Sequence, residues 1–122
     1  MTFPASAAAF DVVMDPNEVL DFKLNAGGLL ESGEVIATGT WTLELLPEAI
    51  ALGLTIMTGG GLDPALLADN RTIYFWLNVD ALFVGNAAYD DGVSLPLRIT
   101  FQSDALPPRT RQRTFVVNLV SQ

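Results

Sequence analysis

Two runs of alternating apolar and polar residues, separated by a glycine-containing turn, constrain the fold of this chain most strongly. The first run passes through Leu20, Phe22 and Leu24, and the second extends over residues 34–45 and includes Trp41. Alternation with a period of two residues is typical of antiparallel strands that have one face on a core and one face in water. This part of the sequence therefore predicts a sheet protein.

The same kind of pattern continues toward the C-terminus. Further strands are expected at residues 51–58, 71–79, 93–102 and 113–120, and shorter ones at 10–14 and 81–88. About seven short strands with turns between them and no long helix are typical of a β-sandwich. The sequence therefore predicts an all-β fold, an immunoglobulin-like antiparallel β-sandwich, in which Trp41 is a candidate for the central core tryptophan.

Two prolines refine this prediction. Asp63 and Pro64 stand where an N-cap and a first helical residue belong, so one helical turn is expected over residues 62–68. Pro96 interrupts an otherwise regular strand and has no amide hydrogen to donate, which predicts a sheet edge or a bulge at that position.

The length of 122 residues is sufficient for one independently folded domain. We expect residues 1–14 to form an N-terminal arm or first strand and residues 15–122 to form the sandwich. Such an arm has two possible places, because it can pack on its own domain or pair with the sheet edge of a neighbour.

The composition argues against an enzyme. The chain has no histidine and no cysteine, which excludes Ser-His and Cys-His catalytic pairs, thiolate or histidine metal ligands and disulfides. The single lysine, Lys23, falls at an outward position of an expected strand, and the carboxylates are scattered over turns and strand ends. We therefore expect no catalytic residue and no cofactor.

Oxygen ligands leave one metal alternative open. Asp11, Asp15, Asn17 and Glu18 gather near one end of the chain, and Asp90, Asp91 and Gly92 form an acidic turn. Calcium binds six to eight oxygens, but neither segment has the alternating ligand spacing of an EF-hand loop. A plain acidic surface is therefore expected at both places, with a structural calcium as the alternative.

The net charge of −8 argues against nucleic acid as a partner and leaves two groups of residues as candidates for a protein interface. Arg109, Arg111 and Arg113 alternate, so an extended backbone would direct all three toward one side. They form either a surface patch paired with nearby carboxylates or a contact site for an acidic neighbour.

The second group is aromatic. Tyr74 and Trp76 share one face of an expected strand, and Tyr89 follows in a nearby loop. Large aromatic side chains are common in cores, and when they are exposed they often anchor interfaces. Both alternatives remain open from the sequence.

The order of motifs in the first third of the chain resembles the small fibre-tail adaptor proteins of tailed bacteriophages. The matching elements are Asp15-Pro16, then Leu20-Asp21-Phe22, then a strand with Gly33, Ile36, Trp41 and Thr42. Phe22 stands where that family usually has tyrosine. Residues 26–30 replace a tryptophan-rich element, and the middle segment, residues 62–70, is longer than in the family.

This resemblance implies a non-enzymatic structural protein of the virion, assembled in the host cytoplasm. It would act as an adaptor at the tail or connector that helps to attach fibres, in multiple symmetric copies that contact other virion proteins. A decoration or cement protein of the phage capsid is the first alternative. The second is a carbohydrate-binding or adhesion module that uses Tyr74, Trp76 and Tyr89 as a stacking platform, and neither a membrane nor a nucleic acid is an expected partner.

Overall fold

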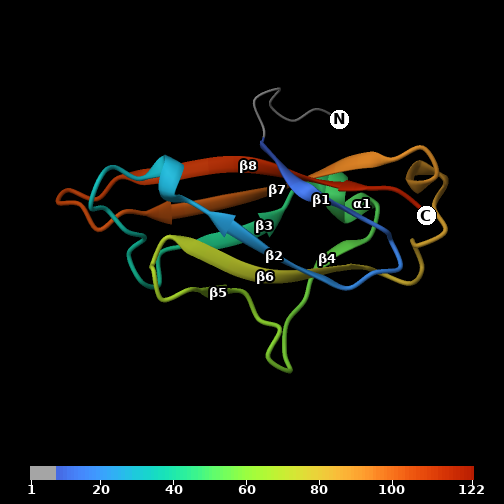
Figure 1. The fold of residues 1–122 in the computed structure, drawn as a ribbon, viewed down its shortest axis with the longest axis horizontal. Coiled ribbons are helices and arrows are strands. Elements are labelled where there is room, and N and C mark those ends of the chain that lie inside the picture. The colour runs from blue at the N-terminus through green and yellow to red at the C-terminus, as the bar shows by residue number, and fades with distance from the viewer. Residues whose placement is uncertain (1–7) are drawn as a thin grey trace.

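The structure, a computed structural model, describes residues 8–122, which form two packed β-sheets (Figure 1). The strands are β1 (Ala8–Met14), β2 (Leu20–Asn25), β3 (Thr42–Leu45), β4 (Leu54–Ile56), β5 (Ala65–Leu66), β6 (Thr72–Val79), β7 (Val93–Gln102) and β8 (Thr110–Leu119). The helical segments are short: η1 (Gly27–Leu29), α1 (Pro47–Ala51) and η2 (Ala87–Tyr89). The part of the expected arm at residues 1–7 lies outside the described residues.

The first sheet has the order β1-β8-β7-β3, and the second has the order β2-β6-β4, with β5 also paired to β6. If β2, β4 and β6 are equated with immunoglobulin strands B, D and E, then β3, β7 and β8 correspond to C, F and G. The predicted all-β sandwich is therefore confirmed. One pairing departs from the expectation of antiparallel strands, because β1 runs parallel to β8.

Strand β1 occupies residues 8–14, the second half of the segment expected to form an N-terminal arm or first strand. It pairs within its own domain, from Ala8 opposite Phe115 to Met14 opposite Leu119. Its Phe10 ring lies 5.2 Å from the Phe22 ring and 5.8 Å from the Phe115 ring, measured between centroids. Because Phe22 belongs to the second sheet and Phe115 to the first, Phe10 connects the two sheets through side-chain packing.

The core forms where the inward rows of both sheets meet. Phe22 and Leu24 of β2 are buried, as the alternation predicts, while Asp21 and Lys23 are exposed. Burial of each large apolar side chain contributes about 1.5–3 kcal/mol. The largest fully buried side chains are those of Tyr89, Phe75, Phe101, Met14, Leu24, Ile36, Ile73, Leu77, Leu95, Leu97, Ile99 and Leu119.

The expected strand over residues 34–45 is interrupted, and only Thr42–Leu45 forms β3. Ala37 donates its N–H to the Gln102 carbonyl at 2.9 Å, and the Thr40 hydroxyl donates to the Ala37 carbonyl at 2.7 Å. This turn shifts the inward row, so that Ile36 is buried. Trp41 is only half-buried, just before β3, and is therefore not the central core residue that the pattern suggested.

Pro96 does not lie at a sheet edge, because β7 is central in its sheet. Its carbonyl accepts a hydrogen bond from the Leu46 N–H at 3.1 Å, so its ring nitrogen faces the β3 side as well. Strand β3 ends at Leu45, and the Leu46 carbonyl turns to accept the N–H groups of Ala49 and Ile50 in α1. The missing donor of Pro96 therefore leaves no carbonyl unsatisfied.

Two local predictions are wrong. The expected helical turn at residues 62–68 contains strand β5 instead, and Asp63 accepts the Gly59 N–H at 2.9 Å rather than capping a helix. The expected strand at residues 81–88 consists of turns followed by η2, whose cap is Asn86, which accepts the Ala88 N–H at 2.9 Å. In both places, side-chain hydrogen bonds of Asp or Asn to nearby amides favour a turn.

Gly53, between α1 and β4, has a positive φ of 82°, and a Cβ atom there would lie 2.6 Å from Phe83. We expect Gly53→Ala to lower the free energy of unfolding by about 2 kcal/mol or more, because backbone strain and overpacking act together. Gly28→Ala is the matched control, since Gly28 has open space around its Cα atom. Urea unfolding measures both variants, and equal effects would contradict the proposed clash.

Candidate functional site

The first candidate surface is the arginine edge, defined as residues 109–114 at the start of β8. Arg111 and Arg113 pair across the ladder with Phe101 and Ile99, which are buried. Residues opposite each other in an antiparallel pair project to the same face, so both arginines continue the inward row of β8 beyond Phe115. The apolar core therefore ends at Phe115 along this strand, and charged side chains follow.

The three arginines differ in their surroundings. Arg109 precedes β8 and forms an ion pair with Glu31, and its Nε lies 3.9 Å from a Glu34 oxygen. The hydrogen bond to Glu31, with the charges of Glu31 and Glu34, raises the pKa of Arg109 above its ordinary value. Arg109 is thus a surface residue paired with carboxylates, the first of the two alternatives that the sequence left open.

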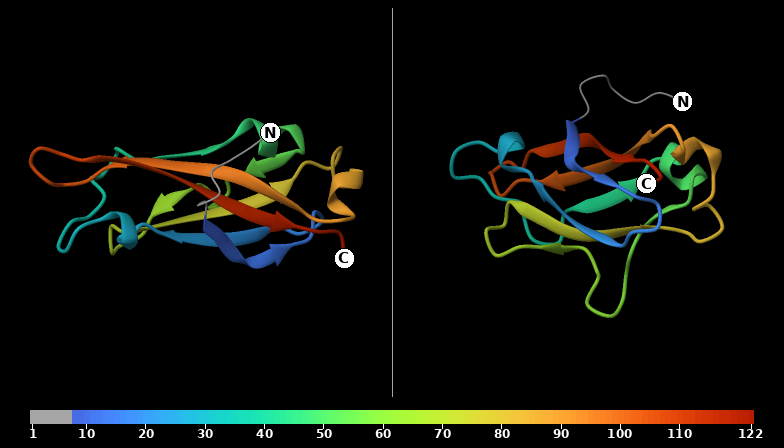
Figure 2. Two further views of the ribbon diagram at one scale, coloured as in Figure 1. Left: turned by 90° about the horizontal axis from the view of Figure 1, so that it is seen from above. Right: turned by 45° about the vertical axis from the view of Figure 1, so that its right-hand side comes forward.

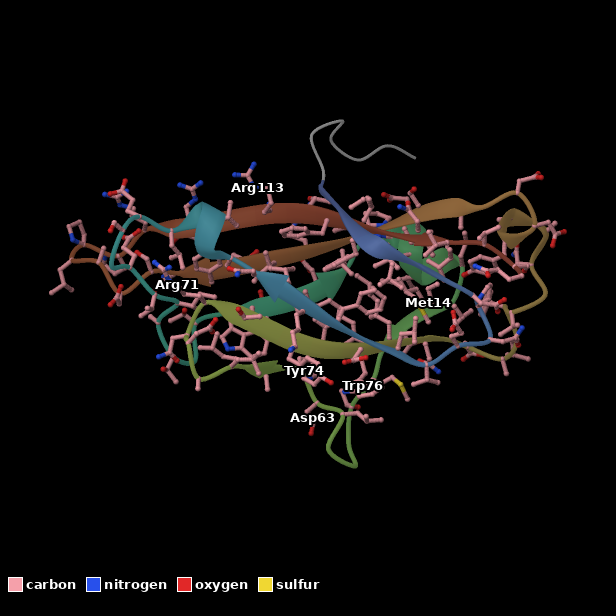
Figure 3. The ribbon with its side chains drawn as sticks, in the orientation of Figure 1. Met14, Asp63, Arg71, Tyr74, Trp76 and Arg113 are labelled. Carbon is pink, nitrogen blue, oxygen red and sulfur yellow. The ribbon has the colours of Figure 1, made fainter. Side chains whose placement is uncertain are left out.

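Arg111 and Arg113 have a different environment. Arg111 is half-buried and Arg113 is exposed, and neither forms an ion pair with any carboxylate side chain that the structure describes. Figure 3 shows the Arg113 side chain projecting from β8 away from the two sheets. These two side chains therefore present positive charge at one end of a strongly acidic protein.

The backbone beside them has an open edge. Ser103 donates its N–H to the Arg109 carbonyl at 2.8 Å, so the backbone groups of Arg109, and by alternation those of Arg111 and Arg113, face β7. The N–H and C=O groups of Thr110 and Gln112 then face the opposite side. Strand β1 begins to pair only at Phe115, so among the described residues no strand pairs with that side of residues 110–112.

The second candidate surface, the aromatic face, lies on the outer side of the second sheet. Tyr74 and Trp76 are both half-buried there, with ring centroids 6.2 Å apart and planes at 76°. The Tyr74 hydroxyl donates to Asp21 at 2.8 Å, and Lys23 Nζ lies 5.9 Å from the Tyr74 ring centroid. Figure 3 shows this face on the side of the molecule opposite Arg113.

Tyr89 does not belong to the aromatic face and is corrected from a candidate interface residue to a core residue. It is fully buried at the end of η2, and its hydroxyl donates to the Leu52 carbonyl at 2.6 Å. Burial raises the pKa of its phenol. The sequence predicted a loop at Tyr89, and the structure has the short helix η2 there. The sequence pattern does not show which aromatic residue of such a segment is buried.

The acidic residues at the other end of the molecule bind backbone amides. Asp15 accepts the N–H groups of Asn17 at 2.7 Å and Gln122 at 2.8 Å, and Glu18 accepts the Asp15 N–H at 2.7 Å. Within the described part of the chain, no group of three or more Asp or Glu side chains is placed to hold a metal ion. Asp15 therefore links the segment between β1 and β2 to Gln122, and Glu18 closes a local turn.

No helix among residues 8–122 has both the length and the apolar character needed to cross a membrane. Comparison of the chain with models of known protein families, with curated proteins and with solved structures finds no match.

Sequence reasoning identified the arginine side chains of the arginine edge but missed its open backbone. The only signal was that the arginines alternate with polar Thr110, Gln112 and Thr114, whereas the later part of β8 has apolar residues on both faces. Whether a strand pairs with residues 110–112 depends on where β1 begins to pair with β8, and this register is set by tertiary packing.

Tyr89→Phe removes the hydroxyl that satisfies the Leu52 carbonyl. We expect the free energy of unfolding to fall by about 1–3 kcal/mol, because a buried acceptor loses its donor. Tyr74→Phe is the matched control and should have a smaller effect, because the Tyr74 hydroxyl binds the exposed Asp21. Thermal and urea unfolding of both variants test this, and an unchanged stability of Tyr89→Phe would contradict the predicted role of its hydroxyl.

The stability of the domain should fall in acid. Hydrogen bonds from the amides of Asn17 and Gln122 lower the pKa of Asp15, and those from the Arg71 amide and the Thr72 hydroxyl lower the pKa of Asp69. A carboxylate with a lowered pKa stabilises the fold above its ordinary value of 3.8 and loses that contribution as pH falls through its folded pKa.

The measurement is the melting temperature from about pH 6 to about pH 2.5, the range in which carboxylates titrate. The Asp15→Asn and Asp69→Asn double variant should show a shallower decrease than the parent protein. Asp91→Asn, at an exposed residue of the acidic turn, serves as the control and should leave the slope unchanged. An identical slope in the double variant would contradict the linkage.

Proposed function

We propose that this protein is a non-enzymatic structural component of a tailed-phage virion, an adaptor at the tail or connector that helps to attach fibres. The arginine edge is the observation that carries this proposal, because an open strand edge with fixed positive charge suits docking to another protein chain. The sequence resemblance at Asp15-Pro16, Leu20–Phe22 and Trp41-Thr42 supports the same class of protein.

The adaptor acts through backbone pairing in this proposal. Many copies arranged around a symmetry axis would each present the same edge to a neighbouring virion protein. The loop between β7 and β8 lies at one end of the molecule and the C-terminus lies toward the other end (Figure 1 and Figure 2). One end can therefore be engaged while the opposite end remains accessible.

The geometry gives less support to a carbohydrate-binding module. A stacking platform needs exposed rings that lie in one plane, but the Tyr74 and Trp76 planes meet at 76° and Tyr89 is buried. An edge-to-face pair of this kind is typical of aromatic side chains that pack against each other on a sheet, and it does not form a flat sugar-binding surface.

Cryo-electron microscopy of the particles with which the protein copurifies tests the proposal. We expect density for this domain at the tail, connector or fibre base, in copies related by the particle symmetry. Density on the capsid shell would instead support a decoration protein, and purification only as a free monomer without particles would contradict a virion role.

The same particles allow a test of the arginine edge. Arg111→Glu with Arg113→Glu should reduce the number of copies incorporated, because charge reversal repels the partner that the arginines attract. Lys23→Glu is a control for the reversal of one charge at a distant site, since Lys23 is exposed on the other sheet and pairs with no carboxylate among the described residues. Equal incorporation of both variants would show that the edge is not used.

A further inference from the structure

We infer that the open side of residues 110–114 binds an acidic segment of a partner protein in extended conformation, which adds a strand to the first sheet next to β8. This inference rests on the proposed function and specifies its partner by chemistry. It depends on three properties of the arginine edge: backbone groups that no described strand pairs, arginines without an ion pair among the described side chains, and a defined length.

The backbone groups provide the attachment. The N–H and C=O groups of Thr110 and Gln112 face away from β7, and an edge of this kind is a template for another strand. Strand β1 occupies the continuation of the same edge from Phe115 onward. An added strand would therefore lie in line with β1, beside a stretch of roughly 13 Å at the usual rise per residue.

The charge selects the ligand. Three of the six basic residues of this protein lie at the arginine edge, although the chain carries a net charge of −8. Arg109 is already paired with Glu31, so the two arginines that remain for a partner are Arg111 and Arg113. An acidic segment would be repelled by most of the surface and attracted here, which favours this edge over others.

The other strand edges suit such a ligand less well. On strand β2 the exposed Asp21 and Lys23 carry opposite charges, so this edge has no net positive charge to attract an acidic ligand. Strand β3 has only four residues, and its Glu44 pairs with Arg98 of β7, with 3.5 Å between the charged atoms. The acidic ligand therefore fits the arginine edge better than the edges of β2 and β3.

Side-chain alternation defines the sequence that fits. Alternate residues of an added strand would lie on the same face as Arg111 and Arg113, and these should be acidic. The intervening residues would lie beside Thr110 and Gln112, where small polar or β-branched side chains fit an exposed strand face. A segment of alternating glutamate and threonine satisfies both conditions.

The test uses a capped peptide of alternating threonine and glutamate, about five residues long to cover the open stretch. Titration into the isotopically labelled protein, followed by NMR, should shift the amide signals of residues 110–114 in a saturable manner. Hydrogen exchange of the Thr110 and Gln112 amides, which should be fast in the free protein, should slow on binding. The Arg111 and Arg113 amides, bonded to β7, should be protected in both states.

Variants separate backbone pairing from charge attraction. Gln112→Pro removes an outward donor without removing a β7 bond and should abolish binding, because proline at this position blocks the edge. Arg111→Glu with Arg113→Glu should weaken binding by about tenfold or more, and raised salt should weaken it as well. Lys23→Glu should leave the affinity unchanged, and circular dichroism verifies that each variant is folded.

Several results would overturn the inference. An alternating threonine–lysine peptide that binds equally well would exclude charge selection, and signal shifts confined to β2 would place the ligand at another edge. Slow exchange of the Thr110 and Gln112 amides in the free protein, made fast by deletion of residues 2–7, would show that the chain's own N-terminus is the occupant of the edge. Concentration-dependent self-association that Gln112→Pro abolishes would identify a second copy as the occupant instead.

This experiment is independent of particle assembly. Peptide binding without incorporation into particles would leave the edge functional and remove the virion role. Incorporation of the Gln112→Pro variant at normal copy number would leave the virion role and remove the edge as the docking site.

Discussion

The packing of Phe10 between the two sheets is the contact on which the arrangement of this domain depends most. Phe10 lies on β1, whose backbone pairs with β8 in the first sheet, while its ring contacts Phe22 and Phe75 of the second. Aromatic pairs of this kind contribute about 0.5–1.5 kcal/mol beyond the burial of their surface. One side chain thus fixes the position of β1 and joins the two layers.

That position also determines where the first sheet is open. Since Phe10 holds β1 against residues 115–119, the pairing covers the second half of β8, and no other strand of residues 8–122 pairs with the outward amide and carbonyl groups of Thr110 and Gln112. The change from Phe115 to Arg113 along the inward row coincides with this boundary. Core packing and the arginine edge are therefore two consequences of one strand register.

The alternating segments of the sequence were sufficient to predict β2, β6, β7 and β8 and the sandwich they form. The wrong predictions concern residues that are compatible with more than one kind of local structure. Asp63 and Pro64 are as suitable for a turn as for a helix start, and Pro96 is accepted in a central strand because β3 ends beside it. The first outcome depends on the nearby Gly59 amide, and the second on the end of β3, which is distant in sequence from Pro96.

The candidate site could also be predicted only in part, because alternation shows which residues share a face but not which distant residues they contact. Alternation placed Arg111 and Arg113 on one side of a strand, and composition made them unusual in an acidic chain. Which arginine finds a carboxylate depends on the segment that carries Glu31 and Glu34, and which tyrosine is buried depends on the position of the Leu52 carbonyl. Neither relation has a local signal in the sequence.

The hydrogen bond from the Gln122 amide to Asp15 has a practical consequence for handling this domain. It holds the last described residue at the end of the sandwich remote from the loop between β7 and β8, as Figure 1 shows. A fluorophore, an affinity tag or a surface-coupling group joined after Gln122 would therefore leave residues 109–114 unobstructed. Attachment ahead of β1 would start from the neighbourhood of the open strand edge, because Ala8 lies opposite Phe115.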